Sequence, residues 1–239
     1  MVSLRELFSM LATGEFSNIS LSRNTTGSIS ESEYPKIIGH INLGLIEIYK
    51  RLRLMENEVT LHAVPEVSDY YLREDRIASL AQISQTRYIE RPANYDGFLN
   101  IIEITKVFDT LGNELTLNNR FVTPAIIQTS TDSLKITKLE EAQTFQIVYQ
   151  AYPNKIVLDS SFDPEDYILQ IPTTILEALL FYIAYRVYKP TGANNSTVNA
   201  DKSASYQQQY ELSCQKLELY GLGIQDCDQD NTFETKGWV

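Results

Sequence analysis

The sequence predicts an α+β fold, in which a bundle of about four helices carries an inserted strand-rich subdomain. Apolar residues recur every three or four positions near the N-terminus and again in the last third of the chain, as on the buried face of a helix. Between these regions the pattern alternates and is broken by turn residues, as in short strands. We therefore expect residues 1–56 and 161–221 to form the helical bundle, residues 57–160 the inserted subdomain, and residues 222–239 a C-terminal arm.

Composition limits the classes of function. The chain has 239 residues, 43% of them hydrophobic, which is enough for a core in one large domain or two small ones. Its formal net charge is −11 and its Lys and Arg residues are scattered, which argues against tight binding of nucleic acid phosphates. Cys214 and Cys227 match neither a redox nor a zinc spacing, so we expect free thiols in a reducing cytosol, with a disulfide as the alternative. The N-terminus, MVSLRELFSM, lacks the features of a secretory signal.

A short helix is predicted at the N-terminus. Ser3 is placed to cap it, Gly14 would end it, and its apolar stripe consists of Leu4, Leu7, Phe8 and Leu11. Residues 17–32 are rich in Ser, Asn and Thr and lose this pattern. We expect them to form a long loop that is either mobile or ordered against a neighbouring copy.

A second amphipathic helix is predicted from Tyr34, with Pro35 in its first turn. Its apolar positions are Ile37, Ile38, Ile41, Leu45, Ile48, Tyr49 and Leu52. His40 and Asn42 lie along the same helix, and we interpret both as polar groups near its surface and not as catalytic residues.

Short strands are predicted through the middle of the chain. VTLHAV, residues 59–64, is the first, and residues 75–83 are expected to form a helical turn or two. The clearest hairpin covers residues 99–117 and turns at residues 109–113. Further strands are expected at residues 125–129, 134–137 and 144–152.

The most apolar stretch is IPTTILEALLFYIAYRVY, residues 171–188. Pro172 suits the first turn of a helix, and the positions after it are apolar or aromatic nearly all round, which predicts a buried helix. Glu177 and Arg186 interrupt the stretch, whereas a membrane span needs about 20 largely uncharged residues. We therefore expect this helix to be the core of a soluble assembly.

The C-terminal region combines a fourth helix with a polar arm. The helix is predicted at about residues 200–220, packed antiparallel on the preceding helix through Tyr206, Tyr210, Ser213, Leu217 and Tyr220. Gly221 and Gly223 would stop it. In the arm, residues 222–239, Phe233 and Trp238 are isolated apolar anchors, so it is either a frayed tail or an arm that docks on another chain.

The fifteen tyrosines of the chain allow two interpretations. Aromatic residues are enriched in interface cores, and a tyrosine-rich interior of the fold explains the same composition.

The sequence indicates neither a catalytic nor a metal site. It has no P-loop, no GxGxxG after a strand, no GxSxG and no HExxH, and its two histidines are His40 and His62. Asp226, Asp228 and Asp230 resemble the start of a calcium loop. That pattern fails at its sixth and twelfth positions, which are Asn231 and Gly237. We predict no catalytic residues, no metal and no cofactor, and interpret the chain as a non-enzyme.

Several segments together resemble a known family. They are INLGLIEIYKRLRL, ITKVFDTLGNELTLNN, TFQIVYQAYP, IPTTILEALLFYIAYRVYKPTG and YQQQYELSCQKLELYG, in this order along nearly the whole chain. This arrangement is similar to that of the head-to-tail adaptor proteins of tailed bacteriophages. The chain is longer than the smaller adaptors, and the strand-rich insertion accounts for the difference.

The resemblance implies a structural virion protein, made in the cytoplasm of the bacterial host and located in the neck between head and tail. It implies a ring, expected to be a dodecamer, beneath the portal protein, which extends the DNA channel and offers a platform to a tail or nozzle protein. DNA would pass through without specific binding, and no membrane would be involved. Phe233 and Trp238 are the residues that we expect to contact the portal. The alternative function is a β-rich module that binds a ligand or peptide on a helical support.

Overall fold

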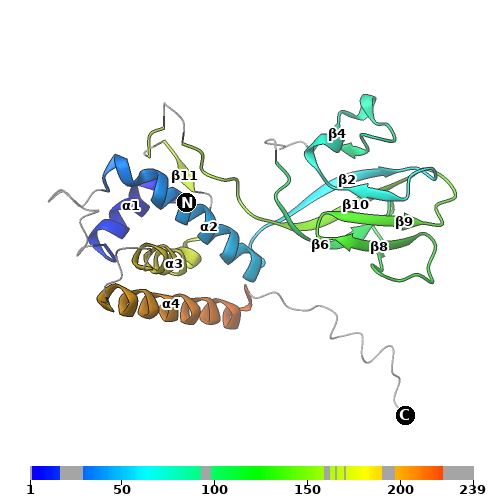
Figure 1. The fold of residues 1–239 in the computed structure, drawn as a ribbon. Coiled ribbons are helices and arrows are strands. Elements are labelled where there is room, and N and C mark those ends of the chain that lie inside the picture. Colours follow the sequence, from blue (N-terminus) through cyan, green and yellow to red (C-terminus); the bar gives the residue numbers. More distant parts are fainter. Residues whose placement is uncertain are drawn as a thin grey trace, which may run out of the picture. The chain divides into compact units, whose positions relative to one another are not determined.

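The computed structural model describes residues 2–16, 29–92, 98–158, 162–164, 166–169, 171–189 and 197–222. The chain divides into two compact units, one formed by Met1–Arg53 with Lys155–Val239 and the other by Leu54–Asn154 (Figure 1). The first unit holds the helices and the second holds most of the strands, so the fold is α+β, as the sequence predicted. The strand-rich unit begins and ends a few residues earlier than the expected 57–160.

Helix α1, Leu4–Thr13, begins with the predicted cap. The backbone N–H of Glu6 donates to the Ser3 hydroxyl, and the Glu6 carboxylate accepts from the backbone N–H of Ser3, which satisfies two donors that a helix start leaves free. All four residues of the predicted stripe are buried, and Gly14 ends the helix. Strand β1, Val2–Ser3, precedes the helix and pairs with β11, Ile168–Leu169.

Helix α2, Tyr34–Arg51, buries every apolar position that its spacing predicted. The predicted loop before it is shorter than expected, because Ile29 is buried and a 3-10 turn, Glu31–Glu33, leads into the helix. Residues 17–28 of that loop lie outside the described residues.

Helix α3, Leu176–Tyr188, contacts α1, α2 and α4 and is the centre of the helical unit (Figure 1). Its buried residues are Ala178, Leu179, Tyr182, Ile183, Ala184 and Tyr188. Pro172 does not lie in the first turn of the α-helix as predicted. Its backbone is extended, with ψ 136°, and a 3-10 turn, Thr173–Ile175, separates it from the helix.

Helix α4, Thr197–Leu217, starts and ends about three residues earlier than predicted and lies antiparallel to α3. A π-type turn, Glu218–Leu222, follows and contains Gly221 at φ 83°, a conformation that favours glycine. The prediction that Tyr220 belongs to the buried stripe is wrong, since its side chain is 83% exposed. The change from α to π winding after Leu217 turns Tyr220 away from α3.

The strand-rich unit contains two sheets. The first has the order β4-β5-β2-β10-β6-β7, and the second has the order β3-β9-β8. Their strands are β2 Glu56–Ala63, β3 Asp69–Tyr71, β4 Ile77–Ala78, β5 Ile89–Glu90, β6 Ile101–Phe108, β7 Glu114–Leu115, β8 Ala125–Ser130, β9 Ser133–Thr137 and β10 Gln143–Ala151. The predicted hairpin is formed by β6 and β7, and the strands expected after it are β8, β9 and β10. Two 3-10 turns, Glu74–Arg76 and Leu80–Gln82, stand where a helical turn or two was expected.

The long central ladder of this unit is the antiparallel pair β2 and β10. It brings the beginning and end of the unit together, because Glu56 pairs with Gln150 and the Ala151 N–H donates to the Met55 carbonyl oxygen at 3.0 Å. A segment whose ends meet in this way can be inserted into another unit without separating the parts that flank it.

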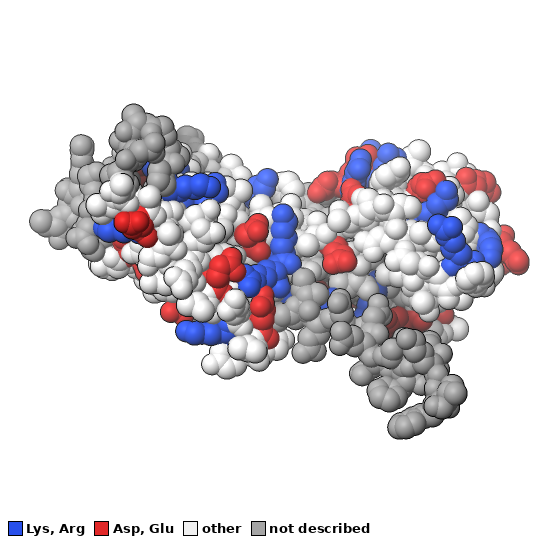
Figure 2. Space-filling view, turned by 60° about the horizontal axis from the view of Figure 1, so that its bottom comes forward, with Lys and Arg blue, Asp and Glu red and all other residues white. Residues whose placement is uncertain are grey.

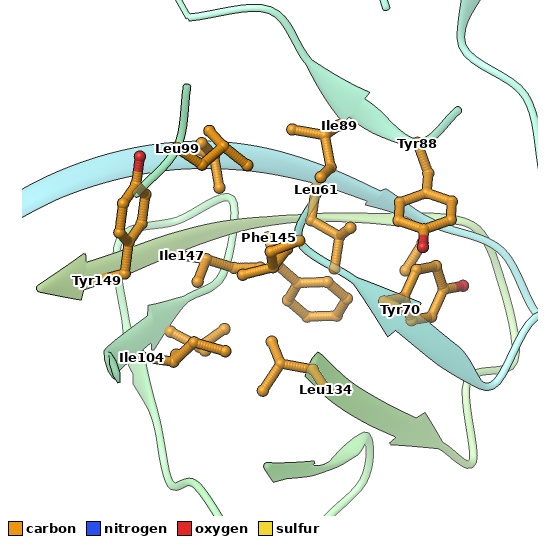
Figure 3. Close-up of a cluster of buried hydrophobic side chains, with 14 of the residues drawn as sticks. Leu61, Tyr70, Tyr88, Ile89, Leu99, Ile104, Leu134, Phe145, Ile147 and Tyr149 are labelled. Atoms are coloured by element: carbon orange, nitrogen blue, oxygen red, sulfur yellow. The ribbon is translucent and has the colours of Figure 1, made fainter. Parts of the chain in front are cut away.

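One cluster of buried side chains fills the strand-rich unit (Figure 3). It draws on both sheets, with Leu61, Phe145 and Ile147 from the first and Tyr70 and Leu134 from the second. The unit therefore has a hydrophobic core of its own.

Candidate functional site

The two histidines have separate structural surroundings. His40 lies in α2, where burial, followed by the charges of Arg186 and Lys36, lowers its pKa and so favours the neutral ring. His62 lies in β2, with Nε2 3.0 Å from Glu90 Oε2 and Nδ1 3.3 Å from Thr144 Oγ1. These three residues come from the neighbouring strands β5, β2 and β10 and form a cross-strand hydrogen-bond ladder, which stabilises a sheet.

The described residues contain no group of three or more His, Cys, Asp or Glu side chains that could hold a metal ion. Asp226, Asp228 and Asp230, the residues that resemble part of a calcium loop, lie outside the described residues, as does Cys227. Cys214 is a buried free thiol in α4, and burial raises its pKa. Among the described helices, none combines the length and the apolar character that crossing a membrane requires.

The helical unit is held together by aromatic contacts between α3 and α4. The Tyr182 and Tyr210 rings meet edge to face at 5.3 Å between centroids, and Tyr188 stacks on Tyr206 at 5.5 Å. Ser203 adds a hydrogen bond from its hydroxyl to the carbonyl oxygen of Tyr185. These rings pack in the interior of the fold, which is one of the two interpretations of the high tyrosine content.

Two polar side chains of α2 make connections that its periodicity did not predict. Asn42 makes two hydrogen bonds to the backbone of Ile156, just after the chain leaves the strand-rich unit. Arg51, in the last turn of α2, donates to Glu211 of α4 at 2.5 Å and to Glu218 in the π-type turn. Arg51 thereby fixes the end of α4, from which residues 222–239 continue.

The strand-rich unit presents large apolar side chains on its turns. Leu111, at the tip of the β6–β7 turn, is 84% exposed, and Phe121, between β7 and β8, is 96% exposed. The Asp109 carboxylate accepts hydrogen bonds from the N–H groups of Leu111 and Asn113, which orders this tip. Single exposed apolar side chains are normal on protein surfaces and do not by themselves mark a site.

Charged side chains of both signs are interspersed on the face shown in Figure 2. No extended basic surface is visible there in the part of the chain that the structure describes. This agrees with the net charge of −11 and differs from the continuous positive surface that a protein needs to grip nucleic acid.

Comparison with known families decides the class of protein. The sequence model of one family, described as SU10 adaptor protein, matches residues 17–224, well over half of the chain. The chain belongs to the SU10 adaptor protein family. A search of curated proteins found no match.

The SU10 adaptor proteins are a family of phage head-to-tail adaptors, so the resemblance seen in the sequence is confirmed. The match spans residues of both compact units. As a member of this family, the protein is a phage adaptor and a virion component, and a structural family of this kind favours a non-enzymatic role.

The residues predicted to contact the portal, Phe233 and Trp238, lie outside the described residues, and their role stays a prediction. Sequence reasoning missed the connections made by Asn42 and Arg51. The sequence did carry a signal for the close contact between α2 and α3 at Gly44, where a Cβ atom would lie 2.8 Å from Tyr182 Cδ1. Gly44 falls among the apolar positions of α2, and a glycine inside a helical pattern can mark a close helix contact.

Proposed function

We propose that the protein forms a ring, a dodecamer, beneath the portal, where it extends the DNA channel and offers a platform for a tail or nozzle protein. The single observation that carries the proposal is the match to the SU10 adaptor family over residues 17–224. The two-unit fold is suited to this task, since a helical unit can form the ring and a separate strand-rich unit can meet another partner.

The charge of the chain suits a DNA conduit. With a formal net charge of −11, like-charge repulsion keeps DNA from adhering while it passes. A basic channel would bind the DNA phosphates, because this binding releases counterions, and the bound DNA would move more slowly.

The competing function is a β-rich module that binds a ligand or peptide. The interior of the strand-rich unit gives it no support, because buried side chains occupy the space between the sheets (Figure 3).

Native mass spectrometry tests the proposal directly. We expect the purified protein to be monomeric or weakly associated alone, and to form a ring when it is mixed with the portal protein of the same phage. Segments that become ordered only on docking would delay assembly until the partner is present. If the protein associates neither with the portal nor with itself, the result would contradict the adaptor function and favour the binding module.

A further inference from the structure

Helix α4 has one face on α3 and an opposite face exposed along its whole length (Figure 1). The buried residues are Ser203, Tyr210, Ser213, Cys214 and Leu217. The exposed ones recur at three- and four-residue spacing on the other side, at Val198, Asp201, Ser205, Gln208, Leu212 and Gln215. Val198, Ser205 and Leu212 are seven residues apart and therefore lie along one side of the helix.

This outer face is unusually poor in charge for an exposed helix of an acidic protein. The 21 residues of α4 include four charged side chains. Two of them are engaged by the fold, since Lys202 lies over the Tyr188 ring and Glu211 pairs with Arg51. Asp201 and Lys216 remain, one of each sign.

Two exposed apolar side chains lie on the same face, one near its beginning and one in its second half. Leu212 is 48% exposed, and Val198 is 61% exposed. Depletion of charge combined with exposed apolar residues is characteristic of the core of a protein interface.

We propose that this outer face of α4, from Val198 to Gln215, is the surface through which one copy of the chain packs against the next. The inference rests on the proposed ring, which requires contact between copies. The charge of the chain is the reason for choosing a second copy as the occupant. Two molecules of net charge −11 repel each other over most of their surface, so they can approach at the lowest electrostatic cost through a face with sparse, balanced charge.

Photo-crosslinking tests the surface in assembled phage particles. A benzoylphenylalanine replaces Leu212 in the full chain, and the matched control replaces Leu111, which is 84% exposed but lies in the strand-rich unit. We expect irradiation at position 212 to give an adduct of twice the chain mass that contains only this chain. At position 111 the yield of that adduct should be at least tenfold lower.

Three results would overturn the inference: an adduct at position 212 with a different virion protein, an adduct within one chain to residues 222–239, or no adduct. The test also separates this inference from the proposed function. If mass spectrometry finds the protein absent from purified particles, the adaptor function fails. If the protein is present and position 212 reacts with another partner, only the α4 contact is wrong.

Purified protein provides an independent measurement. The double substitution Val198→Glu and Leu212→Glu places two like charges per copy on the face, so we expect the dissociation constant for self-association to rise at least tenfold. Leu111→Glu should leave it unchanged. Equal dissociation constants for the double variant and the wild type would contradict the inference. If the purified wild type is monomeric, the crosslink in phage particles is the deciding measurement.

Discussion

The side-chain amide of Asn42 pairs with the backbone of Ile156 as a neighbouring strand would. Asn42 Nδ2 donates to the Ile156 carbonyl oxygen at 3.0 Å, and the Ile156 N–H donates to Asn42 Oδ1 at 2.9 Å. Ile156 is buried and follows Lys155, the residue at which the chain returns to the helical unit. A polar residue of α2 therefore fixes the position of the returning chain and satisfies its buried peptide groups.

This pairing predicts that Asn42→Asp is destabilising although it changes few atoms. The carboxylate keeps an acceptor but loses the donor, and it places an oxygen opposite the Ile156 carbonyl oxygen. The free energy of unfolding should fall by about 1 to 3 kcal/mol, as when a buried polar group loses its partner. Urea unfolding followed by circular dichroism measures it. Gln207→Ala, on the exposed side of α4, is the control. An unchanged free energy of unfolding in Asn42→Asp would show that the pairing contributes nothing to stability.

Two glycines of α2 should respond to alanine in opposite directions. A Cβ atom at Gly44 would lie 2.8 Å from Tyr182 Cδ1 and 2.9 Å from Leu179 Cδ1, whereas one at Gly39 would meet nothing within 4 Å. We expect Gly44→Ala to cost about 1 to 3 kcal/mol through overpacking. Gly39→Ala should stabilise by about 0.5 to 1 kcal/mol, because alanine favours a helix interior. Thermal unfolding of both variants measures these changes, and shifts of the same sign would contradict the close α2–α3 contact.

Arg51 should hold the end of α4 in place. Its side chain is 28% exposed and its partners Glu211 and Glu218 are 47% and 36% exposed, so solvent screens both pairs. Arg51→Met should cost about 1 kcal/mol. Hydrogen exchange of residues 211–222 should accelerate in the variant. Arg73→Met is the control, because Arg73 is 56% exposed and pairs with Asp132 in the strand-rich unit. Unchanged exchange in residues 211–222 would show that Arg51 does not order this segment.

The helices were predictable from the sequence because their signals are local. Three- and four-residue spacing placed the buried residues of α2, and Ser3 as a cap marked the start of α1. Alternation and turn residues did the same for the β6–β7 hairpin.

The contacts that organise the helical unit were not predictable in this way. Asn42 meets a residue 114 positions away, and Arg51 meets one 160 positions away, so no local pattern reports them. Tyr220 was wrongly predicted to be buried because the three- and four-residue spacing assumes α-helical winding, whereas this residue lies in a π-type turn. Of the candidate site, the sequence identified the family, while Phe233 and Trp238 stay predictions.

Residues 222–239 are predicted to contribute to portal binding. A chain that ends at Tyr220 should retain the helical circular dichroism signal and bind the portal at least tenfold more weakly, because large aromatic residues carry much of the energy when an arm docks. The double substitution Phe233→Ala and Trp238→Ala in the full chain should reproduce the loss. Phe121→Ala removes a 96% exposed aromatic elsewhere and is the control. If the shortened chain folds and binds as tightly as the full one, the portal contact lies elsewhere.

Inactivation of the gene in the phage that encodes the protein tests the adaptor function most directly. Electron microscopy of the infected-cell lysate should show heads and tails that are not joined, and supplying the intact protein in trans should restore joined, infectious particles. Joined, infectious particles that lack the protein would contradict its role between head and tail.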